Sequence, residues 1–149
     1  MIEICLWLQG RLGVDVNIVL ASLHAGDQGK RLSKAMLRAM VEGGPGEWHR
    51  EVVVPLRRAR SFAKSQITIS DAGSIAAFRA EVNQLEVAAE KWEQRLIERY
   101  LDGVVPGAPG EARSAIALEN LGQYLSLVGA AFEGEVAERA TRLVHVCVS

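Results

Sequence analysis

The residues that first suggest chemistry are four basic side chains on one predicted helix. Arg50, Arg57, Arg60 and Lys64 fall within about a quarter of the helix circumference, and Glu51 is the main opposing charge in that segment. Such a basic stripe can hold a phosphate group, an RNA backbone or an acidic protein surface. It has no interleaved aromatic residues and no nucleic-acid fold signature. We therefore favour a solvated face that pairs with acidic residues of the next helix, and nucleic-acid binding is possible but unsupported.

The helix that follows carries the complementary charges. Glu86, Glu90 and Glu93 have helical spacing, which suits ion pairs with the basic stripe, acid–base chemistry or a carboxylate metal site. Di-metal helical bundles need Glu-x-x-His pairs, and the sequence has none. Ion pairing is the favoured interpretation.

The histidines and cysteines form no recognisable motif. His24, His49 and His145 make no HExxH or HxH pattern, and Cys5 and Cys147 make no CxxC. The GxSxG, GxGxxG and P-loop patterns are also absent. We therefore expect surface or interface histidines, buried free thiols, and no metal site, cofactor or catalytic residue. A weaker hypothesis is an enzyme of unrecognised type, with acidic residues of the long helix acting beside His24 or His49.

Three further residues are candidate binding residues. Asp15 and Asn17 flank Val16 at the start of a predicted helix, where capping of the backbone is favoured over ligand binding. Trp48 begins another predicted helix and is either a core anchor or an exposed binding hot spot. The core position is favoured for Trp48.

Helical periodicity predicts an all-α fold in which several short helices come first. We expect these at residues 2–12, 16–24 and 32–41, followed by a helix over 47–64. Pro55 should kink that helix about one turn upstream, or the run is two helices that meet near Val54. Residues 65–70 are expected to form a loop, with Ser70 or Asp71 as the N-cap of the next helix.

Two long helices are predicted in the second half of the chain. The first runs to residue 102 and carries an apolar edge at spacings of three and four, which should lie against a partner helix. That edge consists of Ile75, Phe78, Val82, Leu85, Ala89, Trp92 and Leu96. A glycine- and proline-rich loop at 103–110 then reverses the chain into a second long helix over 112–143. The sequence therefore predicts a helical bundle with two long antiparallel helices and several shorter N-terminal helices.

Bulk composition narrows the class of protein. The 149 residues include 49% hydrophobic and 23% charged residues and carry a formal charge of -1. These values predict a single helical domain over residues 1–149, with no overall attraction to nucleic acid or anionic lipid. No apolar run approaches the roughly 18 residues of a membrane span. We expect a cytoplasmic protein without a membrane anchor.

Three sequence blocks resemble a known family. They are CLWLQ at 5–9, GVDVNIVL at 13–20 and WHREVVVPLR at 48–57, the last followed by Arg60. Together they resemble a proteobacterial family of uncharacterised proteins, domain of unknown function 2390. The resemblance implies a small, soluble helical protein with no assigned activity, catalytic residue or cofactor. Family members usually carry another aromatic-containing helix before the equivalent of Cys5, so either the natural protein starts earlier or a partner covers the exposed face.

The leading functional hypothesis is a non-enzymatic protein-interaction module, with self-association included. Its binding surface would be the apolar edge of the long helix or a groove near Cys5, Trp7 and Leu20. The alternative is binding of an anionic ligand or RNA by the basic stripe.

Overall fold

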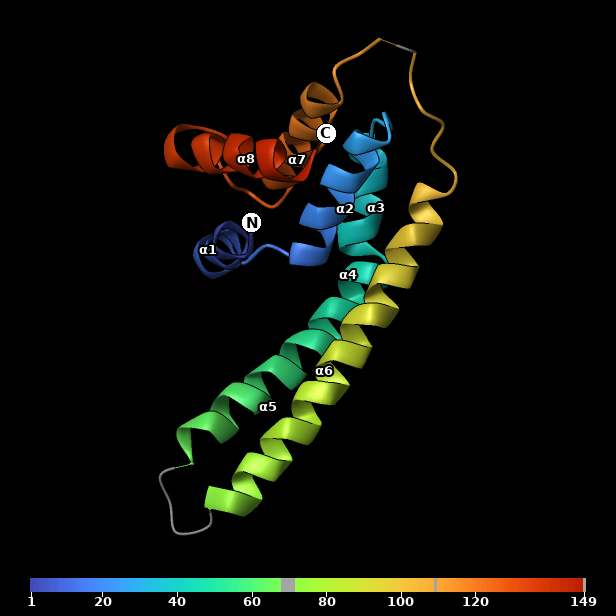
Figure 1. Cartoon of the computed structure of the whole chain (residues 1–149). Coiled ribbons are helices and arrows are strands. Elements are labelled where there is room, and N and C mark those ends of the chain that lie inside the picture. Colours follow the sequence, from blue (N-terminus) through green and yellow to red (C-terminus); the bar gives the residue numbers. More distant parts are fainter. Residues whose placement is uncertain (68–71, 109, 149) are drawn as a thin grey trace.

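The computed structural model describes residues 1–67, 72–108 and 110–148, and every regular element in these ranges is helical, which confirms the all-α class. The elements are α1 (Ile2–Leu12), α2 (Val16–Asp27), α3 (Lys34–Glu42), α4 (Gly44–Trp48), the π-helix η1 (His49–Val53), α5 (Val54–Ser65), α6 (Ala72–Leu101), α7 (Arg113–Leu127) and α8 (Gly134–Cys147). In Figure 1, α1, α2, α7 and α8 gather into a body, and α5 and α6 project from it together as an arm.

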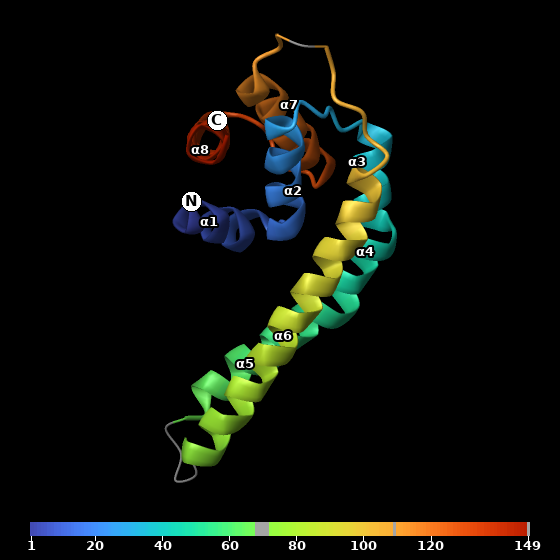
Figure 2. The same cartoon turned by 45° about the vertical axis from the view of Figure 1, so that its right-hand side comes forward.

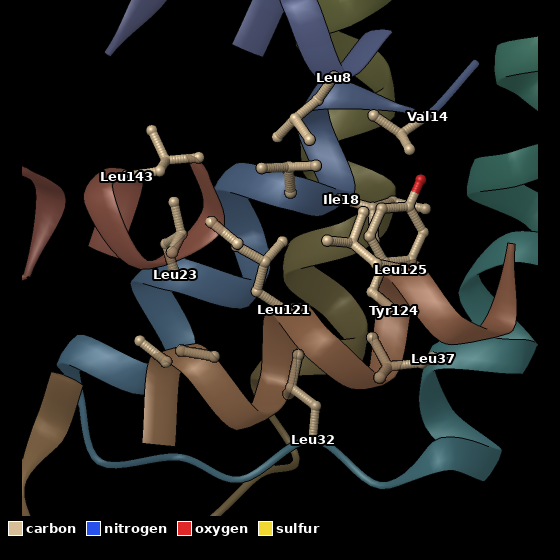
Figure 3. Packing of buried hydrophobic residues seen from close by; sticks show 14 of the residues in the cluster. Leu8, Val14, Ile18, Leu23, Leu32, Leu37, Leu121, Tyr124, Leu125 and Leu143 are labelled. Atoms are coloured by element: carbon tan, nitrogen blue, oxygen red, sulfur yellow. The ribbon is translucent and has the colours of Figure 1, made fainter. Parts of the chain in front are cut away.

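The core of the body lies between helices that are far apart in the sequence. Figure 3 shows Leu8 of α1, Ile18 of α2 and Leu121 of α7 pointing into one apolar cluster, to which α8 contributes Leu143. α2 and α7 approach closely at Gly26, where a Cβ atom would lie 2.2 Å from the Cα of Ala117. Only glycine permits this crossing, so one residue type fixes how tightly the two central helices pack.

The arm is an antiparallel pair of helices. Trp48, at the end of α4, donates to the carbonyl of Ala89, and Arg60 further along pairs with Glu86. As the chain advances along α4 and α5, its partners therefore move backwards along α6, and Figure 2 shows the same pairing from a second side. The predicted hairpin between two long C-terminal helices is wrong, because the partner of α6 is α5.

The second long helix predicted over 112–143 is also wrong, because it is divided into α7 and α8. Gly129 adopts a left-handed φ of 82°, and the amide of Ala130 donates to the carbonyl of Leu125 at 2.9 Å. This arrangement closes a helix and turns the chain away from its axis. The ring of Phe132 then packs 3.7 Å from the position of a Cβ atom on Gly122. This is an ordinary van der Waals distance, so the segment before α8 packs on α7 at a position where alanine would also fit.

The apolar edge predicted on α6 is buried at only some of its positions. Val82 and Ala89 are buried, whereas Leu85 is 58% exposed. The buried face is turned slightly around the helix, so that Glu86 and Glu93 occupy the positions expected for apolar residues. This rotation follows from the basic face of α5, which needs carboxylates opposite it.

Pro55 changes the helix upstream of it without ending it. Helical conformation continues from Gly44 to Ser65, and the turn from His49 to Val53 is a π-helix in which the amide of Val54 donates to the carbonyl of His49. Proline has no N–H and crowds the carbonyl four residues earlier, and a widened turn lies directly upstream of it, where the kink was expected. The regular α-helix resumes at Val54, the position expected for a junction of two helices. The run starts at Gly44 and not at residue 47, since Pro45 is compatible with a first helical turn.

The remaining sequence predictions mostly agree with the structure. The three short N-terminal helices are present, with α2 extending three residues further than expected. Described residues of the loop at 103–110 connect α6 to α7 without helical structure. The predicted N-cap at Ser70 or Asp71 lies outside the described residues, as does part of the loop at 65–70.

Candidate functional site

Three ionisable side chains meet where the arm joins the body. Asp15 is the N-cap of α2, His49 is the first residue of η1, and Glu93 lies on α6. His49 Nδ1 is 3.4 Å from Asp15 Oδ2 and 3.2 Å from Glu93 Oε2. One ligand-type atom from each residue lies within 4.8 Å of the others. We call these three residues the carboxylate–histidine cluster.

Neighbouring polar groups hold the cluster in place. The backbone amide of Asn17 donates to Asp15 Oδ1 at 2.9 Å, and the side-chain amide of Asn17 donates to Glu93 Oε2 at 3.0 Å. Gln94 in turn donates to the Asn17 side-chain oxygen at 3.0 Å. The Tyr124 hydroxyl, which lies beside Val14 in Figure 3, accepts from the amide of Asp15 at 2.8 Å. The capping role expected for Asp15 is therefore present, and Asn17 adds a contact that connects α2 to α6.

Burial shapes the charge state of the cluster. It raises the pKa of Asp15 to about 9, assisted by the hydrogen bond and the negative charge of Glu93. Burial acts on Glu93 in the same direction, but His49, Asp15 and Asn17 together outweigh it and lower the pKa of Glu93. Burial also raises the pKa of the Tyr124 phenol, with the Asp15 charge as a second cause. A single proton shared between the two carboxyls is the expected state of the pair.

Two carboxylate oxygens in the cluster have no hydrogen-bond donor. Among the described residues, Asp15 Oδ2 and Glu93 Oε1 are buried without a hydrogen-bond partner, and the side chains are only 8% and 0% exposed. Protonation of one of the carboxyls would give Asp15 Oδ2 a partner, in agreement with the raised pKa of Asp15. Unpaired oxygens of this kind are costly in a folded protein, so their presence marks a site that a proton or a cation completes.

A surface groove reaches the cluster. It has a volume of about 490 Å³, and His49 is one of its lining residues, together with Gly13, Arg58 and Ser61. The side chain of His49 is 13% exposed. His49 is therefore mostly buried but reaches the surface at this groove, while His24 is exposed and contacts Gln28.

The basic stripe is largely engaged by the α6 carboxylates. Arg57 pairs with Glu86 at 3.1 Å and with Glu90 at 2.8 Å, and Arg60 pairs with Glu86 through two nitrogens. Burial alone would raise the pKa of Glu86, but the hydrogen bonds and charges of Arg60 and Arg57 lower it. Lys64 is exposed near the end of α5. These ion pairs are the internal partners that the sequence interpretation favoured.

Two other sequence candidates make internal contacts. Arg50 donates to the carbonyl of Val41 at 2.8 Å, so its guanidinium spans from η1 to α3. Trp48 is partly buried, donates its indole N–H to Ala89 at 2.9 Å, and packs edge to face against Trp92 with ring centroids 6.4 Å apart. Both side chains stabilise the root of the arm.

The groove expected near Cys5, Trp7 and Leu20 is present with a different lining. It has a volume of about 360 Å³ and includes Cys5 and Leu20 on one side and the Arg57 ion pairs on the other. Trp7 is not part of it, because its ring lies under the Arg139 guanidinium at 4.4 Å. None of the helices in the described ranges has the length and apolar character needed to cross a membrane.

Sequence reasoning considered His49 beside an acidic residue of the long helix but did not assemble the cluster. Its residues lie 34 and 44 positions apart, so no local motif exists. The sequence does contain one indication, which is that Glu93 is a charged residue beside apolar residues on a helix that must pack against others. A carboxylate on a buried face needs a partner, and that need points to His49.

Comparison with known proteins places these residues in a family. A family model described as "Protein of unknown function (DUF2390)" matches residues 1–97. The matched range includes the carboxylate–histidine cluster and the Arg57 and Arg60 ion pairs, and it ends within α6. No curated protein and no solved structure matches the chain. Because the match covers more than half of the chain, the protein belongs to the DUF2390 family of unknown function.

Proposed function

We propose that this protein is a non-enzymatic helical interaction module that pairs with a second copy of itself through one edge of α6. The observation that carries the proposal is an exposed apolar edge. Phe78, Leu85 and Trp92 are 55%, 58% and 40% exposed, and they recur every seven residues. Seven-residue spacing keeps apolar side chains on one line along a helix, which is how helices recognise each other in coiled coils. We call these three residues the α6 edge.

The α6 edge is self-complementary. Leu85 lies at its centre, with one large aromatic residue a heptad away on each side. If two copies pair antiparallel, Leu85 meets Leu85 of the partner subunit, and Phe78 meets Trp92 of the partner subunit. A two-fold axis through Leu85 generates both contacts at once, as an isologous dimer requires. Trp48 packs against Trp92 from behind and keeps that ring in place.

Solution mass tests the proposal. Light-scattering chromatography and sedimentation across a range of protein concentrations should show a dimer of the 16.2 kDa chain. Leu85→Asp should weaken dimerisation at least about thirtyfold, because a central interface side chain contributes roughly 2 kcal/mol or more. Val87→Asp is the matched control, since Val87 is 43% exposed on the same helix but off the α6 edge. It should leave the dimer unchanged.

Cysteine cross-linking tests the register. In a chain with Cys5 and Cys147 replaced by serine, Leu85→Cys should form a disulfide-linked dimer. Phe78→Cys alone should not, because its counterpart is Trp92 of the partner subunit. Cross-linking at Phe78 and Leu85 alike would indicate parallel pairing and contradict the proposed geometry. A monomer at all concentrations, or a dimer broken by Leu6→Asp and not by Leu85→Asp, would show that the α6 edge is not the interface.

The alternative function, anion or RNA binding by the basic stripe, has weaker support. Arg57 and Arg60 already share carboxylates on α6, and Arg50 binds a backbone carbonyl. An external phosphate would have to displace these partners. Lys64 alone offers little attraction, since one exposed ammonium is readily screened by salt.

We also propose that the chain folds as a single domain and is located in the cytoplasm. The core cluster draws side chains from α1 and α2 as well as from α7 and α8, which supports folding as one unit. Cys5 and Cys147 are both unbridged, as thiols in a reducing compartment are.

A further inference from the structure

The spacing of the carboxylate–histidine cluster matches the ligand set of a metal ion. Around a tetrahedral zinc ion with bonds of about 2.0–2.1 Å, neighbouring ligand atoms lie about 3.3 Å apart. His49 Nδ1 lies 3.4 Å from Asp15 Oδ2 and 3.2 Å from Glu93 Oε2. All three ligand atoms are within 4.8 Å of one another, so only a small inward movement of one carboxylate is needed to surround an ion.

The chemistry of the donor atoms limits which metal ion can bind. One imidazole nitrogen and two carboxylates suit first-row divalent transition ions, whereas Mg²⁺ and Ca²⁺ prefer oxygen donors alone. Two carboxylate charges also balance a divalent cation in a buried position. Asp15 Oδ2 and Glu93 Oε1 belong to side chains that are more than nine-tenths buried, and neither oxygen has a hydrogen-bond donor among the described residues. Oε1 is the second oxygen of the Glu93 carboxylate whose Oε2 lies near His49, so both carboxylates have lone pairs to offer. We propose that Asp15, His49 and Glu93 form a binding site for a divalent transition-metal cation of the Zn²⁺ class.

The surroundings of the cluster are those of a metal site. Asn17 donates to Glu93 Oε2 at 3.0 Å, and its own oxygen is held by Gln94. Contacts of this kind orient a metal-binding carboxylate and add to the affinity. Of the three ligands, His49 lines the surface groove, so the cluster is reached from solvent on the His49 side.

A bound cation would connect three parts of the fold. Asp15 belongs to the body, whereas His49 and Glu93 lie on the two sides of the arm at its root. The ion would therefore fix the arm against α2. The α6 edge uses other side chains of α6: Trp92 is next to Glu93 in the sequence, but the proposed centre of the dimer is Leu85, about two turns away. Loss of the metal would therefore leave dimerisation through Leu85 to be tested on its own.

The competing explanation is a shared proton with no metal. In that case a proton between Asp15 and Glu93 satisfies the carboxyls, and the cluster only stabilises the fold. Asp15→Asn distinguishes the two explanations, because its amide reproduces a protonated carboxyl in size and hydrogen bonding while it removes a negative metal ligand. Under the metal proposal the variant folds normally and loses metal affinity.

The test is a metal-binding titration of the full chain with Zn²⁺ and Co²⁺. Zn²⁺ in a competing chelator buffer should bind with one-to-one stoichiometry, with Mg²⁺ and Ca²⁺ binding far more weakly. Asp15→Asn and Glu93→Gln should each weaken Zn²⁺ binding by more than about hundredfold, and Asn17→Ala by about 10–100-fold. Glu86→Gln changes another buried carboxylate on α6, and His24→Gln changes an exposed histidine; both should leave binding unchanged.

Direct spectroscopy keeps the test informative if a variant fails to fold. On the unaltered chain, Zn²⁺ should shift the ring-nitrogen NMR signals of His49 and leave those of His24 and His145 in place. The Co²⁺ complex should lack the thiolate charge-transfer band that Cys5 or Cys147 would produce. Substoichiometric binding, unchanged affinity in Asp15→Asn and Glu93→Gln, or a thiolate band would each overturn the proposal.

Discussion

Replacing Asp15 by Asn should change how stability depends on pH. Burial and the neighbouring Glu93 raise the pKa of Asp15 to about 9, whereas an aspartate in an unfolded chain titrates near 3.9. Between these pH values the folded protein keeps a proton that the unfolded chain has released. Stability must therefore fall as pH rises through this window. Glu93, whose pKa is lowered, acts in the opposite sense, and its stabilisation is lost only at acidic pH.

The size of the effect follows from the proton count. One proton held only by the folded state gives a slope of about 1.4 kcal/mol per pH unit, so the free energy of unfolding should fall by up to about 3 kcal/mol from pH 6 to pH 8. Asp15→Asn has no such proton to lose. Its amide can accept from the Asn17 N–H as Asp15 Oδ1 does and can donate to Glu93. The variant should therefore lose most of this slope and become the more stable protein at high pH.

Urea denaturation at several pH values, with a chelator present to remove metal ions, measures both curves. The difference between the native protein and Asp15→Asn isolates this carboxyl from His49, Glu93 and Tyr124, which are common to both chains. Asp102→Asn, at an exposed position after α6, is the control and should retain the native slope. Equal slopes for the native protein and Asp15→Asn would refute the shared-proton assignment.

Four further substitutions test the packing of the body, all read out by urea denaturation. Gly26→Ala should destabilise the protein by about 1–3 kcal/mol, since the new Cβ would sit 2.2 Å from Ala117 Cα and force α2 from α7. Gly10→Ala should stabilise it by about 0.5–1 kcal/mol, because the new Cβ would have no described atom within 4 Å apart from its own stretch of helix. A loss of stability there would contradict the open helical surface assigned to α1. Asn120→Leu should cost more than about 2 kcal/mol, because its side chain satisfies one backbone amide and two carbonyls in the buried interior. Tyr124→Phe should cost about 1–3 kcal/mol by removing the hydroxyl that accepts from the first amide before α2, and a neutral result would show that water replaces it.

Helical class and the short N-terminal helices could be predicted because they depend on local patterns. Apolar spacing, a capping Asp15 and the glycine after α1 act within a few residues of each other. The division of the C-terminal run was harder to see, because Gly122 and Gly129 are both compatible with a helix of low stability. The left-handed turn at Gly129 ends α7 through a local hydrogen bond from Ala130 to Leu125, and Phe132 then packs near Gly122. Glycine is compatible with either outcome, so composition alone does not show which glycine ends the helix.

The candidate functional site could not be predicted from local sequence patterns, for a different reason. On α6, apolar side chains at Leu85 and Trp92 suggested the buried face, yet Glu86 and Glu93 occupy it. Hydrophobicity alone predicts that the leucine and the tryptophan are more buried than the glutamates. That order is reversed here because partner helices supply arginine and histidine to the glutamates. The compensating residues lie 26 or more positions away, so only the assembled fold shows which charges are paired.

The projecting arm turns small angles into large displacements. From Glu93 at its root to the start of α6, the helix extends about 30 Å at 1.5 Å per residue. A rotation of 10° about the root would thus carry the far end through about 5 Å, while the side chains at the root shift by a fraction of that distance. The carboxylate–histidine cluster lies at the pivot, so whatever sets the separation of α2 and α6 there also sets the direction in which the arm points.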